Sequence, residues 1–135
     1  MALQYSVTVR NAQLDAIETA VGTSAVLKIR TGSVPATCAT ADSGTVLATL
    51  SLPSDWMAAA SSGSVTKSGT WEDTSADATG TAAHWRLYAS DGTTCHAQGT
   101  VTATGGGGDM TVDNTSFASG QSFTVTAFTI TAGNA

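Results

Sequence analysis

Side chains that could bind a metal through nitrogen or sulfur are few in this chain and poorly spaced. They are His84, His96, Cys38 and Cys95. Adjacent residues of a strand point to opposite faces of a sheet, so Cys95 and His96 could not readily hold one ion. The spacing of these residues also matches no zinc-binding pattern. We therefore expect no metal site.

An acidic segment and a glycine-rich segment raise the question of calcium or phosphate binding. Glu72, Asp73 and Asp77 could offer carboxylate oxygens to calcium, but their spacing departs from the EF-hand pattern and favours a solvated loop. The run Gly105–Gly108 is followed by neither the lysine nor the helix that a Walker phosphate loop needs. No serine, histidine and acid set stands out from the hydroxyl-rich background. We expect no cofactor, no catalytic residues and no enzymatic activity.

The sequence leaves open whether the two cysteines form a disulfide bond. Cys38 follows Pro35 in an expected loop, and Cys95 lies early in an expected strand. An even number of cysteines permits a disulfide bond. An intracellular origin favours free thiols, whereas a particle released from the cell could oxidise later. A Cys38–Cys95 bridge and two free thiols both remain open.

One helix is expected near the N-terminus, over residues 12–21. Asn11 is a suitable N-cap, Leu14 and Ile17 fall at helical spacing, and Gly22 is placed to end the helix. Such a helix either docks on a partner through Leu14 and Ile17 or covers the open end of a sandwich.

The rest of the chain predicts strands separated by short turns. Alternating apolar residues and turn residues place seven of them: Ala25–Arg30, Thr45–Leu52, Ser64–Trp71, Thr81–Ala89, Thr94–Thr102, Asp109–Val112 and Gln121–Thr131. We expect an all-β fold, a β-sandwich or jelly roll of about seven or eight strands, with one short N-terminal helix. Residues 1–23 would form an arm and helix, and residues 24–135 the sandwich.

One hairpin can be aligned in detail. A three-residue loop, Ser90–Gly92, would place Leu87 opposite Cys95 and Trp85 opposite Ala97, which forms one continuous apolar face. The alternating polar residues would then point outward: His84, Arg86, His96 and Gln98.

Trp56 and Met57 follow a proline and precede a run of alanines. Trp and Met are enriched at the centres of protein interfaces. These two residues are therefore either a candidate interface or a plug for the edge of the sandwich.

Composition restricts the class of function. Charged residues make up 11% of the 135 residues and the net charge is −5, against about 25% charged residues in an average domain. Nucleic-acid binding, which needs clustered basic residues, is not expected. Residues 1–10 lack the pattern of a secretory signal, and no apolar stretch is long enough to span a membrane. With 6% aromatic residues the core is expected to be thin, so stability is expected to depend partly on a partner or on oligomerisation.

Four segments resemble small virion proteins of tailed bacteriophages: Ser24–Gly32, Ala76–Ala82, Trp85–Thr94 and Ser119–Thr126. The resemblance extends from about residue 5 to residue 133. Within that group the chain is most similar to capsid cement (decoration) proteins, such as the jelly-roll cement protein of a Bordetella podovirus.

The resemblance implies a structural protein on the outer surface of an icosahedral head, assembled in the host cytoplasm. Its implied partner is the major capsid protein, with self-association into a homo-oligomer, a dimer being favoured. The alternative is a receptor- or carbohydrate-binding β module of a tail fibre or surface protein. Sugar sites favour exposed aromatic side chains, and Trp56, Trp71 and Tyr88 are the candidates for that alternative.

Overall fold

The computed structural model describes residues 3–133, which form one helix and ten strands. In chain order the elements are α1 (Val7–Val21), β1 (Val26–Arg30), β2 (Val46–Ser51), β3 (Ser64–Thr66), β4 (Glu72–Asp73), β5 (Gly80–Thr81), β6 (His84–Tyr88), β7 (Cys95–Ala103), β8 (Met110–Val112), β9 (Ser116–Phe117) and β10 (Phe123–Thr131).

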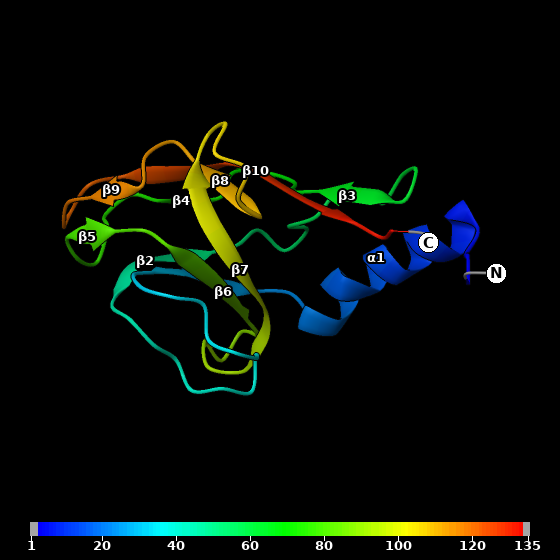
Figure 1. Ribbon diagram of the computed structural model, residues 1–135, viewed down its shortest axis with the longest axis horizontal. Helices are drawn as coiled ribbons and strands as arrows, with labels where there is room; N and C mark the ends of the chain where they lie inside the picture. The colour runs from blue at the N-terminus through cyan, green and yellow to red at the C-terminus, as the bar shows by residue number, and fades with distance from the viewer. Residues whose placement is uncertain (1–2, 134–135) are drawn as a thin grey trace.

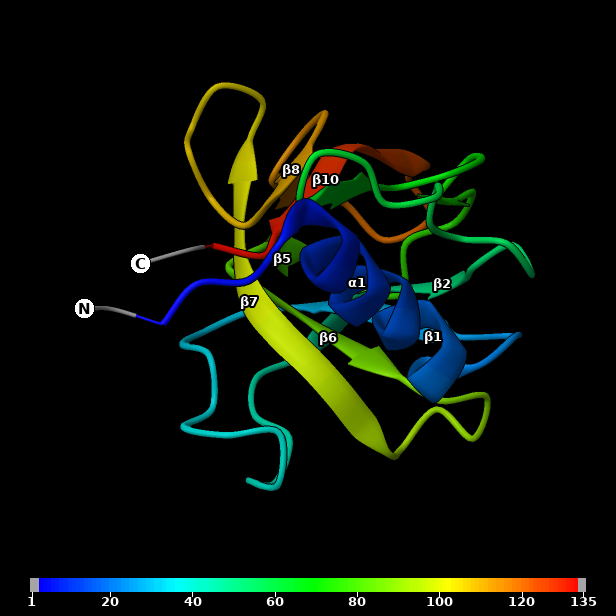
Figure 2. The same cartoon turned by 90° about the vertical axis from the view of Figure 1, so that its right-hand side faces the viewer.

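The strands form two layers around a shared core. β2, β1 and β6 lie in one layer, β8, β10, β4 and β3 lie in the other, and β7 crosses from the first layer to the second (Figure 1). The main sheet follows the order β2-β1-β6-β7-β8-β10-β3, with β4 also paired to β10, while β5 and β9 form a separate pair. α1 lies across one end (Figure 2). The predicted all-β sandwich with one helix is confirmed, with ten strands instead of seven or eight.

The helix begins earlier than the sequence predicts. Ser6, not Asn11, is the N-cap, and its hydroxyl accepts a hydrogen bond from Val9 N at 3.3 Å. The Asn11 side chain instead accepts a bond from Gly63 N at 2.9 Å, which ties the helix to the turn before β3. The predicted end is confirmed, because Gly22 caps the helix with φ 91°.

The helix shares its core with the strands. Leu14 and Val21 are buried together with residues of both layers. Of the two roles expected for the helix, the face with Leu14 and Val21 therefore has the second, because it covers the end of the sandwich.

The β6–β7 hairpin differs from its predicted register by two residues. Leu87 lies opposite Ala97 and not Cys95, and Trp85 lies opposite Gly99. The connection is longer than expected because the Asp91 carboxylate accepts hydrogen bonds from the amides of residues 93 and 94. A bulge also interrupts the ladder between Leu87 and Tyr88. A shift by two residues leaves each side chain on the same face of the sheet, so the predicted apolar face is retained.

Every residue of β6 is buried, which contradicts the expected outward placement of His84 and Arg86. The segment 31–45 crosses the outer face of β6 and covers these side chains (Figure 1). His96 alone of the four polar residues is exposed, and Gln98 is half-buried.

The glycine run connects β7 and β8, which are parallel neighbours. Parallel strands usually need a longer connection. Here Gly108 N donates to the Thr102 hydroxyl at 3.0 Å, and a Cβ on Gly106 or Gly108 would meet that side chain at less than 3 Å. The glycine run therefore allows the chain to turn back tightly between the end of β7 and the start of β8.

Candidate functional site

The side chains expected at an interface lie mostly inside the molecule. Trp56, Met57 and Leu14 are at most 4% exposed, and Ile17 is half-buried. Trp56 packs on Trp71 with ring centres 6.1 Å apart, and its indole N–H donates to Gly22 O at 3.2 Å. This corrects their interpretation as exposed contact residues: Trp56 and Met57 plug the edge of the sandwich.

The aromatic residues considered for sugar binding are also buried. Trp56, Trp71 and Tyr88 are at most 1% exposed. They offer no surface on which a sugar ring could stack.

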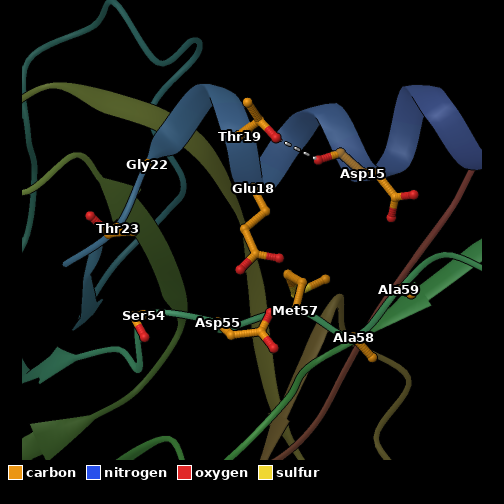
Figure 3. Close-up of a pocket in the computed structure, with 10 residues that line it drawn as sticks. All are labelled: Asp15, Glu18, Thr19, Gly22, Thr23, Ser54, Asp55, Met57, Ala58 and Ala59. Carbon is orange, nitrogen blue, oxygen red and sulfur yellow. Dashed lines mark hydrogen bonds between the residues drawn. The ribbon is translucent and has the colours of Figure 1, made fainter.

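An acidic cleft of about 600 Å³ lies between α1 and the segment 54–59 (Figure 3). Glu18 points from the helix toward Asp55 and Met57. Its Oε1 accepts a hydrogen bond from Trp56 N at 3.0 Å, and Asp15 Oδ1 accepts one from Ala60 N at 2.9 Å. Partial burial raises the pKa of Glu18, and the nearby Asp55 carboxylate adds to the rise. These carboxylates fasten the segment to the helix.

The chemistry available in the cleft is limited by these bonds. Glu18 and Asp15 are each engaged with a backbone N–H. Within residues 3–133, no group of three or more His, Cys, Asp or Glu side chains is placed to hold a metal ion. The carboxylates that line the cleft therefore position the segment before β3.

A second polar cluster lies between β6 and the segment 31–45. Arg86 donates to Asp42 Oδ1, to Thr40 O at 3.1 Å and to Cys38 O at 2.9 Å. Arg30 pairs with Asp42 Oδ2 at 2.9 Å, and the Tyr88 hydroxyl donates to Asp42 Oδ1 at 2.7 Å. One carboxylate thus receives three donors and holds the covering segment in place.

Protonation in this cluster follows from burial and charge. Burial and the hydrogen bond to Asp42 raise the pKa of Tyr88 to about 12. Burial lowers the pKa of His84, and the two arginines lower it further. His84 is therefore neutral at pH 7, and its Nδ1–H donates to Gly32 O at 2.8 Å. For Asp42, burial alone would raise the pKa, but the Tyr88 hydroxyl and the arginines lower it. The cluster is a hydrogen-bonded network in which Asp42 is ionised and His84 and Tyr88 are neutral at pH 7.

Cys38 and Cys95 are free, half-buried thiols, and they lie near enough for Cys38 to affect the pKa of Cys95. Burial raises the pKa of Cys95, and a hydrogen bond with the Cys38 thiol raises it further. The fold therefore brings together the two cysteines that the sequence leaves open to pairing, and the disulfide itself stays a prediction.

The acidic segment 72–77 is held by the neighbouring strand. Asp73 Oδ2 accepts a bond from Thr49 N at 3.0 Å, and Asp77 Oδ2 accepts one from the Thr49 hydroxyl at 2.8 Å. Glu72 and Asp73 themselves form β4. The carboxylates connect this segment to β2.

The predictions place an arm within residues 1–23 but do not single out its exposed apolar side chains. Leu3, Tyr5, Val7 and Val9 are 72%, 43%, 49% and 41% exposed, and they are the large exposed apolar side chains of the described chain. They alternate with polar residues, a pattern typical of a strand, although Val7 and Val9 lie in the first turn of α1. This alternation is the feature of the sequence that could have identified them.

Comparisons with protein-family models, curated proteins and solved structures found no match. Within residues 3–133, no helix is both long enough and apolar enough to cross a membrane.

Proposed function

We propose that this chain is a structural protein of a tailed-phage virion that binds the outside of the icosahedral head. There it would link neighbouring major capsid proteins as a cement protein. The resemblance of four segments to cement proteins supports this proposal, and so does the low content of charged residues.

The observation that carries the proposal is the exposed N-terminal segment, residues 3–9, called the arm from here on. Its four large apolar side chains are 41% to 72% exposed. Burial of such a side chain stabilises by about 1.5–3 kcal/mol. A segment that leaves them in water is suited to contact with another protein, and contacts repeated over many copies add avidity.

The surface of the strands suits the same role. Thr126 on β10 shares hydrogen bonds with the hydroxyls of Thr104 and Thr111, at 3.0 and 3.1 Å. Hydroxyl groups cost less to remove from water than charges do. A threonine-covered surface can therefore be buried against a shell without paired charges.

The test is binding of the full chain to purified heads that lack it, taken from the virus whose genome encodes it. We expect saturable co-sedimentation with heads, and density for the chain on the outer shell by cryo-electron microscopy. Leu3→Ser with Tyr5→Ser should weaken binding at least tenfold. The matched control changes an exposed polar position of the arm, Thr8→Ser, and should bind as the wild type does. Absence of binding to heads would refute the proposal.

A further inference from the structure

The segment 31–45 covers the outer face of β6 but adds little to the core. It is the cyan loop that passes below β2 and β6 in Figure 1. Among residues 31–45, all of which the structure describes, only Pro35 is buried and none belongs to the hydrophobic core. Segments with few buried apolar contacts open locally at a low free-energy cost. The free energy of opening this segment therefore depends mainly on its polar contacts.

The polar contacts that hold the segment come from three strands. Arg30 of β1 and Arg86 of β6 both bind the Asp42 carboxylate of the segment. Gln98 of β7 donates to Pro35 O at 2.6 Å. Because two of these partners are cations, the hold on the segment depends on the balance of charge beneath it.

His84 is fully buried beneath the same segment. It is 0% exposed, and its Nδ1–H donates to Gly32 O at the start of the segment, at 2.8 Å. In this neutral ring Nε2 is a hydrogen-bond acceptor. Within residues 3–133 that atom is buried without a partner. Protonation would therefore create a buried N–H donor that has no acceptor.

The charged groups that surround His84 are already unbalanced. Arg30 lies directly opposite it on β1, and Arg86 lies two residues along β6 on the same face. Asp42 is the one acidic residue of the segment 31–45. On the β7 side Thr100 lies opposite His84 and carries no charge. A protonated His84 would be a third cation beside a single anion.

The remaining titratable groups near this face do not restore the balance. Asp109, at the far edge of β7, is engaged by a neighbouring amide and hydroxyl. Lys28 on β1 is a further cation on the same face. Tyr88, Cys38 and Cys95 carry no positive charge, and burial raises the pKa of both Tyr88 and Cys95, which keeps these two uncharged in acid.

We propose that the segment 31–45 is an acid-released cover, which detaches from β6 when His84 is protonated while the rest of the sandwich stays folded. The imidazolium would repel Arg30 and Arg86 beneath the segment, and its Nε2–H would reach water only after opening. Opening would expose the two arginines on a chain whose net charge at pH 7 is −5. At neutral pH the same face stays covered.

The direction of the pH dependence follows from the pKa of His84. Burial lowers this pKa, and the two arginines lower it further. Once the segment opens, the ring has the ordinary histidine pKa of about 6.5. Below that value the open form binds more protons than the closed form, so each drop of one pH unit favours opening by up to about tenfold. Asp42, whose pKa is lowered in the closed form, is ionised in both forms above about pH 5.

Exchange of arginine Nε hydrogens with solvent measures the opening. The Nε atoms of Arg30 and Arg86 are buried, so their hydrogens should exchange only when the segment opens. NMR of the full chain should follow both from about pH 7 to about pH 5, with free arginine as the reference for intrinsic exchange. We expect protection to fall by up to about tenfold per pH unit in the wild type. Backbone amides of β10 should keep their protection.

The two histidines of the chain provide a variant and a matched control. His84→Asn removes the titration but keeps an amide donor for Gly32 O. We expect the protection of the Nε hydrogens in this variant to be independent of pH. His96→Asn changes the other histidine, which is exposed, and should keep the wild-type profile.

Titration of the His84 ring in the wild type needs no variant. Its Cε1–H signal should titrate below the ordinary value of about 6.5, together with the loss of Nε protection. Titration at the ordinary value with both Nε hydrogens still protected would overturn the proposal. Equal pH profiles of the wild type and His84→Asn would do the same, and so would a parallel loss of protection in β10, which indicates global unfolding.

Discussion

Asp42 is the acceptor on which three donors converge. It pairs with Arg30 and Arg86 and accepts from the Tyr88 hydroxyl. The Arg30 and Arg86 side chains are 8% and 1% exposed, whereas the Asp42 side chain is 37% exposed. The carboxylate thus joins buried positive charge to a segment that reaches water.

Asp42→Asn should therefore destabilise the fold. The change keeps the shape but removes the negative charge, which leaves both arginines without their anionic partner. We expect a loss of about 1–3 kcal/mol in the free energy of unfolding, measured with urea at neutral pH. Asp113→Asn is the control, because that exposed carboxylate accepts one long bond from Thr124 N. Equal effects of the two changes would contradict this role for Asp42.

The raised pKa of Glu18 predicts that stability depends on pH with the opposite sign to that expected for a salt-bridged acid. Its pKa in the native state lies above 4.5. Between that value and the raised pKa, the native protein binds more protons than the unfolded chain does. Stability must then fall as the pH rises through this interval.

Glu18→Gln should remove that dependence, since the amide oxygen can still accept from Trp56 N. Urea unfolding of both proteins from about pH 4 to about pH 7 should show the wild type losing stability relative to the variant. A constant difference between wild type and Glu18→Gln across this interval would contradict the argument.

At the scale of elements, the segment 31–45 is held on β6 and β7 by polar contacts. Besides the Asp42 network, Gln98 Nε2 donates to Pro35 O at 2.6 Å. The neighbouring thiols of Cys38 and Cys95 give this segment a place where it can be fixed covalently to β7.

Mild oxidation should join Cys38 to Cys95 within one chain. Because the raised pKa of Cys95 limits its thiolate at neutral pH, the reaction should accelerate as the pH increases. Thiol titration should detect the loss of both thiols, and the closed loop should stabilise the fold by about 2–4 kcal/mol. Cys38→Ser is the control that cannot close the loop. Two thiols that persist under oxidant would contradict this prediction.

The local sequence pattern predicted some helix ends and strands better than others. Gly22 ended the helix as predicted, because a positive φ is a local requirement. Its start was missed because Val7 and Val9 have a strand-like pattern, while Asn11 is used in a contact with Gly63. β4, β5 and β9 contain two residues each, too few to form a period.

At the scale of the whole molecule, the small net negative charge makes association between copies of the chain sensitive to pH. The sequence pI is about 4.5 and the net charge at pH 7 is −5. Charge repulsion between copies therefore disappears as the pH approaches the pI. Light scattering should show the strongest association near pH 4.5, and it should weaken toward pH 7. A minimum of association near the pI would contradict this expectation.

Local sequence pattern was enough to predict the all-β class, the parity of the β6–β7 apolar face and the end of the helix. Each of these depends on contacts between near neighbours, which leave a period or a turn residue in the chain. The structure was needed to show that His84 and Arg86 are buried, that Trp56 is internal, and that an apolar groove lies between β7 and β10. These depend on segments far apart in the chain, and a polar side chain looks the same in sequence whether water or another segment covers it.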